Sequence, residues 1–244
     1  MIKSNREIDT LAIIPAREGS KRLPRKNVLP LAGKPLIQWS IDEAIKTDSI
    51  DLIAVTSDDD EVLAIANEYK SQNVISIKRP PELSTDIAKS VDAVTHTLLH
   101  LSKMGIYPKQ VLLLQPTSPL RKACDIQGAI DFFEKEKADN VISVCELEHP
   151  TAWCGMISED RVLHGFDLSV SRSQEARKEY RINGAIYVAN RLAFMSKGSM
   201  IFEKPKVFVM PNERSIDIDT YFDFKLCEAL MLDDSQCKNK CCSL

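Results

Sequence analysis

"LAIIPAREGSKRLPRKN", residues 11–27, joins an apolar run to a strongly positive loop and decides how the chain is organised. The run "LAIIPA" (11–16) is almost continuously apolar, which is typical of a strand covered on both faces of its sheet. The loop then carries one acid, Glu18, among five cations: Arg17, Lys21, Arg22, Arg25 and Lys26. In open α/β sheets, ligands bind beyond the carboxyl ends of the strands. The stretch therefore predicts an α/β fold with an anion site after its first strand.

Short apolar runs recur along the chain and alternate with stretches of helical periodicity. We predict further strands at "LIAVTS" (52–57), "NVISI" (73–77), "VLLLQ" (111–115), "NVISV" (140–144), "GAIYVA" (184–189) and "KVFVM" (206–210). Between the strands, apolar side chains recur three and four positions apart, and a last helix carries Phe222, Leu226 and Leu230 on one face. This rhythm predicts a doubly wound, mostly parallel sheet with helices on both faces.

Residues 146–182 break this rhythm, because they are polar, rich in charge and poor in strand signals. We interpret this segment as an excursion from the sheet, either a flap over the active site or a dimerisation arm. The chain has no internal repeat and no low-complexity linker, so residues 1–244 are predicted to form a single domain. Residues 233–244 contain three cysteines and are predicted to be an exposed, flexible tail.

The composition is that of a globular protein and excludes several classes of function. The 244 residues are 44% hydrophobic and 27% charged with a net charge of −3, so a general nucleic-acid surface is not expected. No apolar run approaches the roughly 20 residues of a membrane span, and the polar N-terminus lacks a signal-peptide core. Seven cysteines, an odd number, argue against a disulfide framework. We therefore expect a cytoplasmic protein that binds neither membranes nor nucleic acids.

The positive loop has the composition of a phosphate site. Gly19 and Ser20 allow the backbone to turn tightly and leave amides free for an anion. The loop cations repel each other unless something negative neutralises them, and a triphosphate is the simplest candidate. The alternative is a solvated run of charge. The chain lacks G-x-x-x-x-G-K-[ST] and G-x-G-x-x-G, so neither a P-loop hydrolase nor a dinucleotide-dependent oxidoreductase is supported.

A second chemical signal is "SIDIDT" (215–220), in which Asp217 and Asp219 are two residues apart. On a strand, this spacing places both carboxylates on one face and turns Ile216 and Ile218 to the other. Two carboxylates aimed at one point favour a cation between them, and Mg²⁺ is held by one or two carboxylates together with substrate phosphates. The alternative is a half-buried strand whose polar face is wet.

Five stretches in this order resemble motifs of the acylneuraminate cytidylyltransferases, or CMP-sialic acid synthetases, a family that includes the CMP-legionaminic and CMP-pseudaminic acid synthetases. The matching stretches are "IIPAREGSKRLPRKN" (13–27), "RPPELSTDIAKS" (79–90), "LLQPTSPLR" (113–121), "YRINGAIYV" (180–188) and "SIDIDT" (215–220). The resemblance implies a Rossmann-like nucleotidyltransferase sheet with a protruding dimerisation arm. It also implies a homodimer in which residues 146–182 reach towards the partner's site.

The resemblance also assigns roles to residues at the matching positions. It implies that Asp217 and Asp219 bind Mg²⁺. Contacts with the nucleotide are implied for Asn27, Arg79 and Ser90. Contacts with the sugar acid are implied for Gln115, Arg181, Asn183 and Tyr187. Many members have two adjacent arginines followed by "QDLP" before the "YR" of the fourth motif; here "SRSQEARKEYR" keeps only Arg172 of the pair, so either Arg172 or Arg177 is the candidate carboxylate clamp.

The reaction implied is the joining of CTP to a nine-carbon α-keto sugar acid, with release of pyrophosphate. We choose Arg17 and Lys21 to clamp the triphosphate, since phosphoryl chemistry needs positioning and positive charge more than covalent catalysis. Either a carboxylate or the metal could activate the sugar hydroxyl. The alternatives are a cytidylyltransferase for the eight-carbon acid Kdo, a catalytically inactive nucleotide-sensing module and a structural dimerisation protein. The identity of the acid, whether sialic, legionaminic or pseudaminic, stays open.

Overall fold

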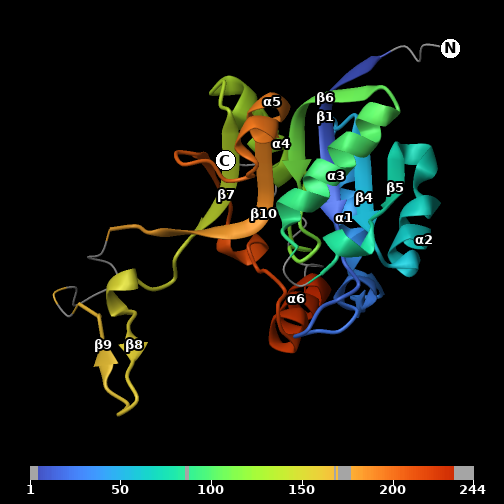
Figure 1. Cartoon of the computed structure of the whole chain (residues 1–244). Coiled ribbons are helices and arrows are strands. Elements are labelled where there is room, and N and C mark those ends of the chain that lie inside the picture. The colour runs from blue at the N-terminus through green and yellow to red at the C-terminus, as the bar shows by residue number, and fades with distance from the viewer. Residues whose placement is uncertain (1–4, 86–87, 168, 170–176, 234–244) are drawn as a thin grey trace.

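The computed structural model describes residues 5–85, 88–167, 169 and 177–233, and its centre is a single sheet. The strands of this sheet are β1 (Arg6–Pro15), β4 (Leu52–Ser57), β5 (Val74–Lys78), β6 (Ile106–Leu113), β7 (Asn140–Glu146), β10 (Tyr180–Asn190) and β11 (Lys206–Val209). They lie in the order β11–β7–β10–β6–β1–β4–β5 (Figure 1). β10 runs antiparallel to β6 and β7, whereas the other neighbouring pairs in this sheet are parallel.

Helices cover both faces of the sheet, as the periodicity predicts. The helices are α1 (Leu36–Ile45), α2 (Asp60–Glu68), α3 (Ser90–Lys103), α4 (Ala123–Lys135), α5 (Arg191–Lys197) and α6 (Tyr221–Asp233). Apolar side chains of α1, α2 and α4 pack on one face, and those of α3 and α5 pack on the other. The predicted doubly wound, mostly parallel sheet is therefore confirmed. No helix in the described ranges is long and apolar enough to cross a bilayer.

A third apolar cluster lies beside the positive loop and joins it to the end of the chain. It contains Leu23 of the loop, Ile218, and Phe224 and Cys227 of α6. The predicted last helix is present and carries Phe222, Leu226 and Leu230 on one face, but this face is exposed: Phe222 is 75% exposed, and Leu226 and Leu230 are exposed as well. Apolar and polar side chains are mixed around this helix. Which of its faces is buried is therefore determined by its contacts with the neighbouring loop.

The predicted strand at "SIDIDT" is also wrong, because residues 215–219 form no strand and lie outside the sheet. Its two isoleucines nevertheless face the apolar interior. Ile218 is fully buried in the third cluster and Ile216 packs against it. The amide of Ile218 donates to the carbonyl of Thr117 at 2.8 Å, so the segment lies beside the loop that comes after β6.

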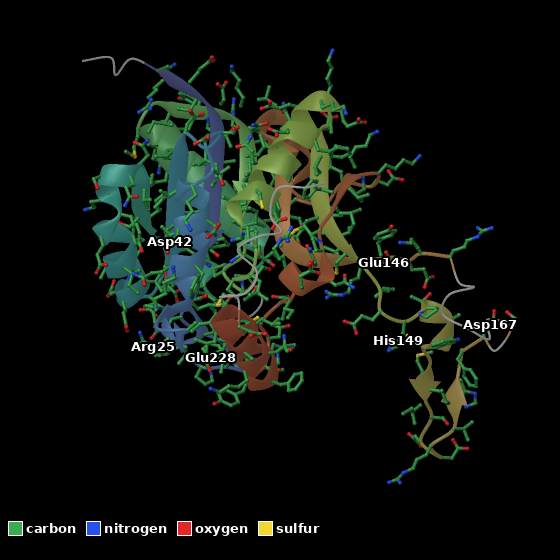
Figure 2. All side chains as sticks on the ribbon, turned by 180° about the vertical axis from the view of Figure 1, so that it is seen from behind. Arg25, Asp42, Glu146, His149, Asp167 and Glu228 are labelled. Atoms are coloured by element: carbon green, nitrogen blue, oxygen red, sulfur yellow. The ribbon has the colours of Figure 1, made fainter. Side chains whose placement is uncertain are left out.

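The excursion predicted at residues 146–182 is confirmed with narrower bounds: Glu146 ends β7 and residues 180–182 already belong to β10, and the described residues between them leave the sheet and project as an arm (Figure 1). It carries the short hairpin β8 (Met156–Ile157) and β9 (Leu163–His164), and a second hairpin, β2 (Pro30–Leu31) and β3 (Lys34–Pro35), follows the positive loop. Figure 2 shows Glu146 where the arm begins, with His149 and Asp167 farther out. The predicted tail, residues 233–244, lies outside the described residues apart from Asp233.

Candidate active site

Three parallel strands deliver residues to one cavity of about 480 Å³, a volume in the range of small-molecule sites. Pro15 ends β1, Arg79 follows β5, and Gln115 follows β6. Ser90, the first residue of α3, lines the same cavity. The carboxyl ends of parallel strands meet at one edge of a sheet, which is where ligands bind in open α/β folds. The site therefore lies where the opening stretch predicts it.

Four of the five loop cations line this cavity: Arg17, Lys21, Arg22 and Lys26. Arg25 instead binds Asp59 at 3.2 Å and Glu61 at 2.6 Å, both at the start of α2. Its backbone is left-handed, with φ 54°, which is uncommon for a residue with a side chain. Four cations of the loop therefore line a cavity that could bind a ligand, and the fifth anchors the loop to α2. The alternative of a simple solvated run of charge does not describe this loop.

Lys26 is the site residue that sequence reasoning missed. Its ammonium is buried and donates to the carbonyl of Ile218, and it lies 3.6 Å from Asp219 Oδ1. Burial lowers the pKa of Lys26, and the nearby carboxylates of Asp219 and Asp217 oppose that shift. Lys26 therefore ties the phosphate loop to the two-aspartate segment. Its only signal in the sequence was membership of the loop, since the turning of one cation inward depends on a segment far away in the chain.

Asp217 is a mostly buried carboxylate, and burial raises its pKa. The proximity of Asp219 raises it further, whereas Thr117 and Lys26 act in the opposite direction. Its Oδ1 atom is buried and has no hydrogen-bond partner among the described residues. A buried carboxylate oxygen without a donor is costly unless something positive binds it. This oxygen is therefore available as a ligand for a cation.

Asp219 is more exposed and faces the loop cations directly. Its Oδ2 lies 2.9 Å from Arg22 Nη2, and its backbone amide donates to Asp223 Oδ2 at 3.1 Å. Asp223 also accepts from the amide of Thr220 at the start of α6. Asp219 is therefore held from the side of its backbone by the helix terminus and from the side of its carboxylate by the loop.

The donor set of this pair fits Mg²⁺. Carboxylate oxygens are hard ligands, and Mg²⁺ in proteins is bound through one or two carboxylates plus substrate phosphates. The unpartnered Oδ1 of Asp217 supplies one such oxygen. In the described part of the chain, no cluster of three or more His, Cys, Asp or Glu side chains is arranged for a metal. A divalent cation here would therefore need ligands from a bound phosphate as well.

The residues predicted to contact the nucleotide all line the cavity: Arg17, Lys21, Asn27, Arg79 and Ser90. Asn27 is fixed by donating to the carbonyl of Arg17 at 3.0 Å. Arg79 is buried and donates to the carbonyl of Thr56 at 2.6 Å, while its Nε has no partner among the described residues. Burial lowers the pKa of Arg79. The structure thus brings this set together, and their individual roles stay predictions.

Gln115 is the predicted sugar-binding residue that lines the cavity. It packs closely against Gly184, where an added Cβ would lie 2.8 Å from Gln115 Oε1 and 3.7 Å from Asp217 Oδ2. Gly184 has φ +77°, a conformation that side chains rarely adopt. A glycine in the fourth motif therefore makes room for a predicted sugar ligand and a predicted metal ligand at the same place.

Asn183 and Tyr187 point into the protein. Asn183 is 2% exposed, donates to Ser215 Oγ at 2.9 Å and accepts from Ser143 Oγ at 2.6 Å. Because these bonds occupy the amide, we reassign Asn183 from a sugar contact to a support for the segment that carries Asp217. Tyr187 is buried among apolar side chains, and burial, together with the charge of Asp217, raises the pKa of its hydroxyl.

Two of the three predicted arginines of the sugar side, Arg177 and Arg181, lie at the root of the arm. Arg181 is exposed, and its Nη2 donates to the carbonyl of Ser215 at 3.3 Å. Arg177 is also exposed, and neither of them lines the cavity. Arg172 lies outside the described residues. The choice between Arg172 and Arg177 as carboxylate clamp is therefore not made by the structure.

Arg121, the last residue of the third motif, is a supporting residue to which the sequence analysis assigns no role. It is 1% exposed, and its guanidinium donates to Gln115 O at 3.1 Å, Ala185 O at 2.7 Å and Ser40 Oγ at 2.8 Å. Burial lowers its pKa to about 10. A buried guanidinium fixed to carbonyls on both sides sets the distance between the Gln115 loop and β10.

Comparisons with known proteins agree with this geometry. The model of a family described as cytidylyltransferase matches residues 11–231. An N-acylneuraminate cytidylyltransferase of Escherichia coli is 34% identical over 88% of this chain, which spans only 50% of that relative's length. A CMP-N,N'-diacetyllegionaminic acid synthase of Legionella pneumophila is also 34% identical, over 91% of this chain and 95% of its own.

The fold has a solved counterpart as well. The structure of a CMP:2-keto-3-deoxy-manno-octonic acid synthetase complexed with CTP superposes with a TM-score of 0.69, covering 93% of this chain and 99% of that one. At 17% sequence identity, this likeness concerns the fold alone. The family match, by contrast, runs from the first buried strand to the last helix and takes in the elements that build the cavity. The chain therefore belongs to the cytidylyltransferase family.

Proposed function

We propose that this chain transfers CMP from CTP to the anomeric hydroxyl of a nine-carbon α-keto sugar acid and releases pyrophosphate. The observation that carries the proposal is the approach of the phosphate loop to the aspartate segment. Arg22 lies 2.9 Å and Lys26 3.6 Å from the carboxylate of Asp219, beside a cavity lined by Arg17 and Lys21. Such an arrangement can hold a polyphosphate and a cation together, which nucleotidyl transfer requires.

The chemistry follows from what these residues can do. The hydroxyl oxygen bonds to the α-phosphorus of CTP in line with the bond to pyrophosphate, which breaks. Arg17 and Lys21 neutralise charge on the phosphate oxygens and on the leaving pyrophosphate. Mg²⁺, when bound by Asp217 and Asp219, would supply further positive charge at the phosphates and lower the pKa of the hydroxyl. The proton of the hydroxyl passes either to a carboxylate of this aspartate pair or to solvent once the bound metal has lowered the pKa of the hydroxyl.

The class of sugar acid is proposed from the sequence relatives. The N-acylneuraminate and N,N'-diacetyllegionaminate enzymes are equally identical to this chain, so both types of nonulosonic acid are candidates. Kdo is less supported, since the octonic acid synthetase shares the fold at only 17% identity. Gln115 is our candidate for the acyl or hydroxyl groups of the sugar, because its amide lines the cavity and can donate and accept.

We also propose that the chain works as a homodimer through its arm. The arm exposes a group of large apolar side chains: Trp153, Met156, Ile157, Val162, Leu163 and Phe166. Its hairpin has two-residue strands, which are too short to be stable without packing against something else. An exposed apolar patch of this kind marks an interaction site. Sedimentation equilibrium of the whole chain and of an Ile157→Asp variant tests this, and a monomeric wild-type protein contradicts it.

A cytoplasmic location is proposed from the cysteines. Among the described residues, Cys145, Cys154 and Cys227 are free thiols. Free thiols are usual in the reducing cytoplasm and unusual in secreted proteins. Fractionation of the cells that express the chain, followed by immunoblotting, tests this location. Recovery of the chain in an extracytoplasmic fraction contradicts it.

The decisive experiment for the activity is a grid of reactions that measures pyrophosphate release. Each of the four ribonucleoside triphosphates is combined with N-acetylneuraminate, N,N'-diacetyllegionaminate, pseudaminate or Kdo, with Mg²⁺ or with EDTA. We expect release with CTP and one or more of the nine-carbon acids, and only with Mg²⁺. Release with Kdo alone would favour the eight-carbon alternative. Binding of CTP without release in any combination would favour a nucleotide-sensing module.

A further inference from the structure

Asp219 is bound by two loop cations that differ in how firmly they are held. Lys26 Nζ lies 3.6 Å from Oδ1, and its side chain is only 11% exposed because it also binds the carbonyl of Ile218. Arg22 Nη2 lies 2.9 Å from Oδ2, and its side chain is 66% exposed. Lys26 is thus a fixed neighbour of Asp219. Arg22 reaches it from the surface of the loop and can leave it without exposing buried groups.

The other cations that are anchored in this loop bind elsewhere. Arg25 is tied to the start of α2, and Arg17 Nη1 donates to the carbonyl of Thr85 at 2.9 Å. Arg22 therefore stands out as an exposed cation that lies in the cavity wall and bonds directly to a predicted metal ligand. Its guanidinium occupies a carboxylate oxygen that a cation would need.

We propose that Arg22 holds Asp219 as a stand-in for the metal in the nucleotide-free protein, and that the triphosphate of CTP draws Arg22 away and so opens Asp219 to the divalent cation. This inference rests on the proposed function, in which Asp219 binds the metal. A guanidinium and a divalent cation repel each other and compete for the same oxygen. A triphosphate offers Arg22 several oxygens that it can bind in a bidentate manner, which favours the exchange.

The consequence is an order of assembly at the site. The metal binds weakly to the free protein, because the metal must displace Arg22 from Asp219. It binds more tightly once the nucleotide has drawn Arg22 away. By thermodynamic linkage, the metal improves the affinity for CTP by the same factor. The ion pair is solvent-exposed, since Asp219 is 43% exposed, so its contribution is modest. We expect the competition to be worth about two- to fivefold in metal affinity, in line with the strength of exposed ion pairs.

The first test measures Mn²⁺ affinity without nucleotide, by the electron paramagnetic resonance signal of free Mn²⁺. Arg22→Gln should bind Mn²⁺ about two- to fivefold more tightly than the wild type. Lys89→Gln is the matched control, because it removes a positive charge from the same cavity wall at the start of α3. Equal gains in Mn²⁺ affinity from the two substitutions would mean that the effect comes from the overall positive charge of the cavity and not from the ion pair of Arg22. That result would overturn the proposal. An unchanged affinity in Arg22→Gln would also overturn it.

The second test is a double-mutant cycle on CTP affinity measured in EDTA, which needs no metal. If Asp219 holds Arg22 away from the phosphates, Asp219→Asn tightens CTP binding more in the Arg22 background than in Arg22→Gln. Additive effects contradict the proposal. If neither wild type nor Arg22→Gln binds Mn²⁺ without nucleotide, this cycle decides alone. Loss of Mg²⁺-dependent turnover in Asp219→Asn tests the metal role separately, so failure of the proposed function and failure of the Arg22 exchange are distinguishable.

Discussion

Gly184 leaves the space that the side chain of Gln115 fills: a Cβ at residue 184 would lie 2.8 Å from Gln115 Oε1. The two residues come from different strands of the sheet, since Gln115 follows β6 and Gly184 lies within β10. Arg121 fixes this relationship by donating to the carbonyls of Gln115 and Ala185. The predicted sugar side of the cavity therefore depends on a glycine and a buried arginine that do not line the cavity themselves.

Gly184→Ala is expected to impair both folding and sugar binding. The residue has φ +77°, and a side chain there costs about 1–3 kcal/mol of folding free energy. The new methyl also displaces the Gln115 amide, so KM for the sugar acid should rise more than KM for CTP. Gly198→Ala is the matched control, because it has φ +60° and no atom within 4 Å of its Cβ position. Steady-state kinetics and thermal unfolding of both variants separate backbone strain from the clash; equal KM changes would refute the clash.

Asp219→Asn is expected to abolish Mg²⁺-dependent pyrophosphate release from CTP. The substitution keeps the shape of the side chain and removes the charge that would hold the cation, and loss of a charge-stabilising group of this kind costs about 10²–10³ in kcat. Asp131→Asn, an exposed residue of α4, controls for the same chemical change far from the cavity. Near-normal turnover in Asp219→Asn would exclude its metal role.

Lys26→Met is expected to lower kcat far more than a surface lysine does. Methionine keeps the apolar stem but removes the ammonium that binds Ile218 O and lies 3.6 Å from Asp219. Without it, the phosphate loop loses its tie to the aspartate segment, and we expect a fall in kcat of about 10²-fold or more. Lys46→Met, an exposed lysine paired with Glu43, is the control. A variant with normal kcat and lowered melting temperature would make Lys26 purely structural.

Asp217→Asn is expected to inactivate the protein and yet stabilise its metal-free form. Burial raises the pKa of Asp217, so the folded protein holds this proton more tightly than the unfolded chain. Stability is therefore lost as the pH rises from the unfolded pKa through the folded one, and at neutral pH the ionised carboxylate is a cost. Asparagine, which is neutral, avoids that cost.

The measurement is thermal unfolding in EDTA across pH 4–8. For a chain of this size, each kcal/mol corresponds to roughly 2–4 °C in Tm. Asp217→Asn should unfold at a higher temperature than the wild type at pH 7, and the difference should shrink towards acid pH. A lower Tm at pH 7 would mean that the carboxylate is stabilised in the fold by Lys26 and Thr117 beyond the cost of burial.

The sequence by itself determined the sheet, its helices and the edge at which ligands bind. Runs such as "LAIIPA" and "LIAVTS" are apolar at nearly every position, a local property that specifies a strand buried on both faces. The positive loop then had to lie at the carboxyl end of such a strand, where the structure places the cavity. The separation of Ile216 and Ile218 from the two aspartates was likewise a local signal, and both isoleucines pack in the third apolar cluster although the segment joins no sheet.

Only the tertiary structure decided which polar residues face the ligand and which support them. Lys26 turns inward because it meets Ile218, 192 residues away in the chain, whereas Arg25 turns outward to α2. The amide of Asn183 is hydrogen-bonded to Ser143 and Ser215. Helix α6 buries Phe224 and Cys227 instead of Phe222. Charge and polarity are properties of a residue, but the direction of a side chain depends on partners that folding brings from distant segments. Local patterns therefore specify the elements, and long-range contacts specify the site.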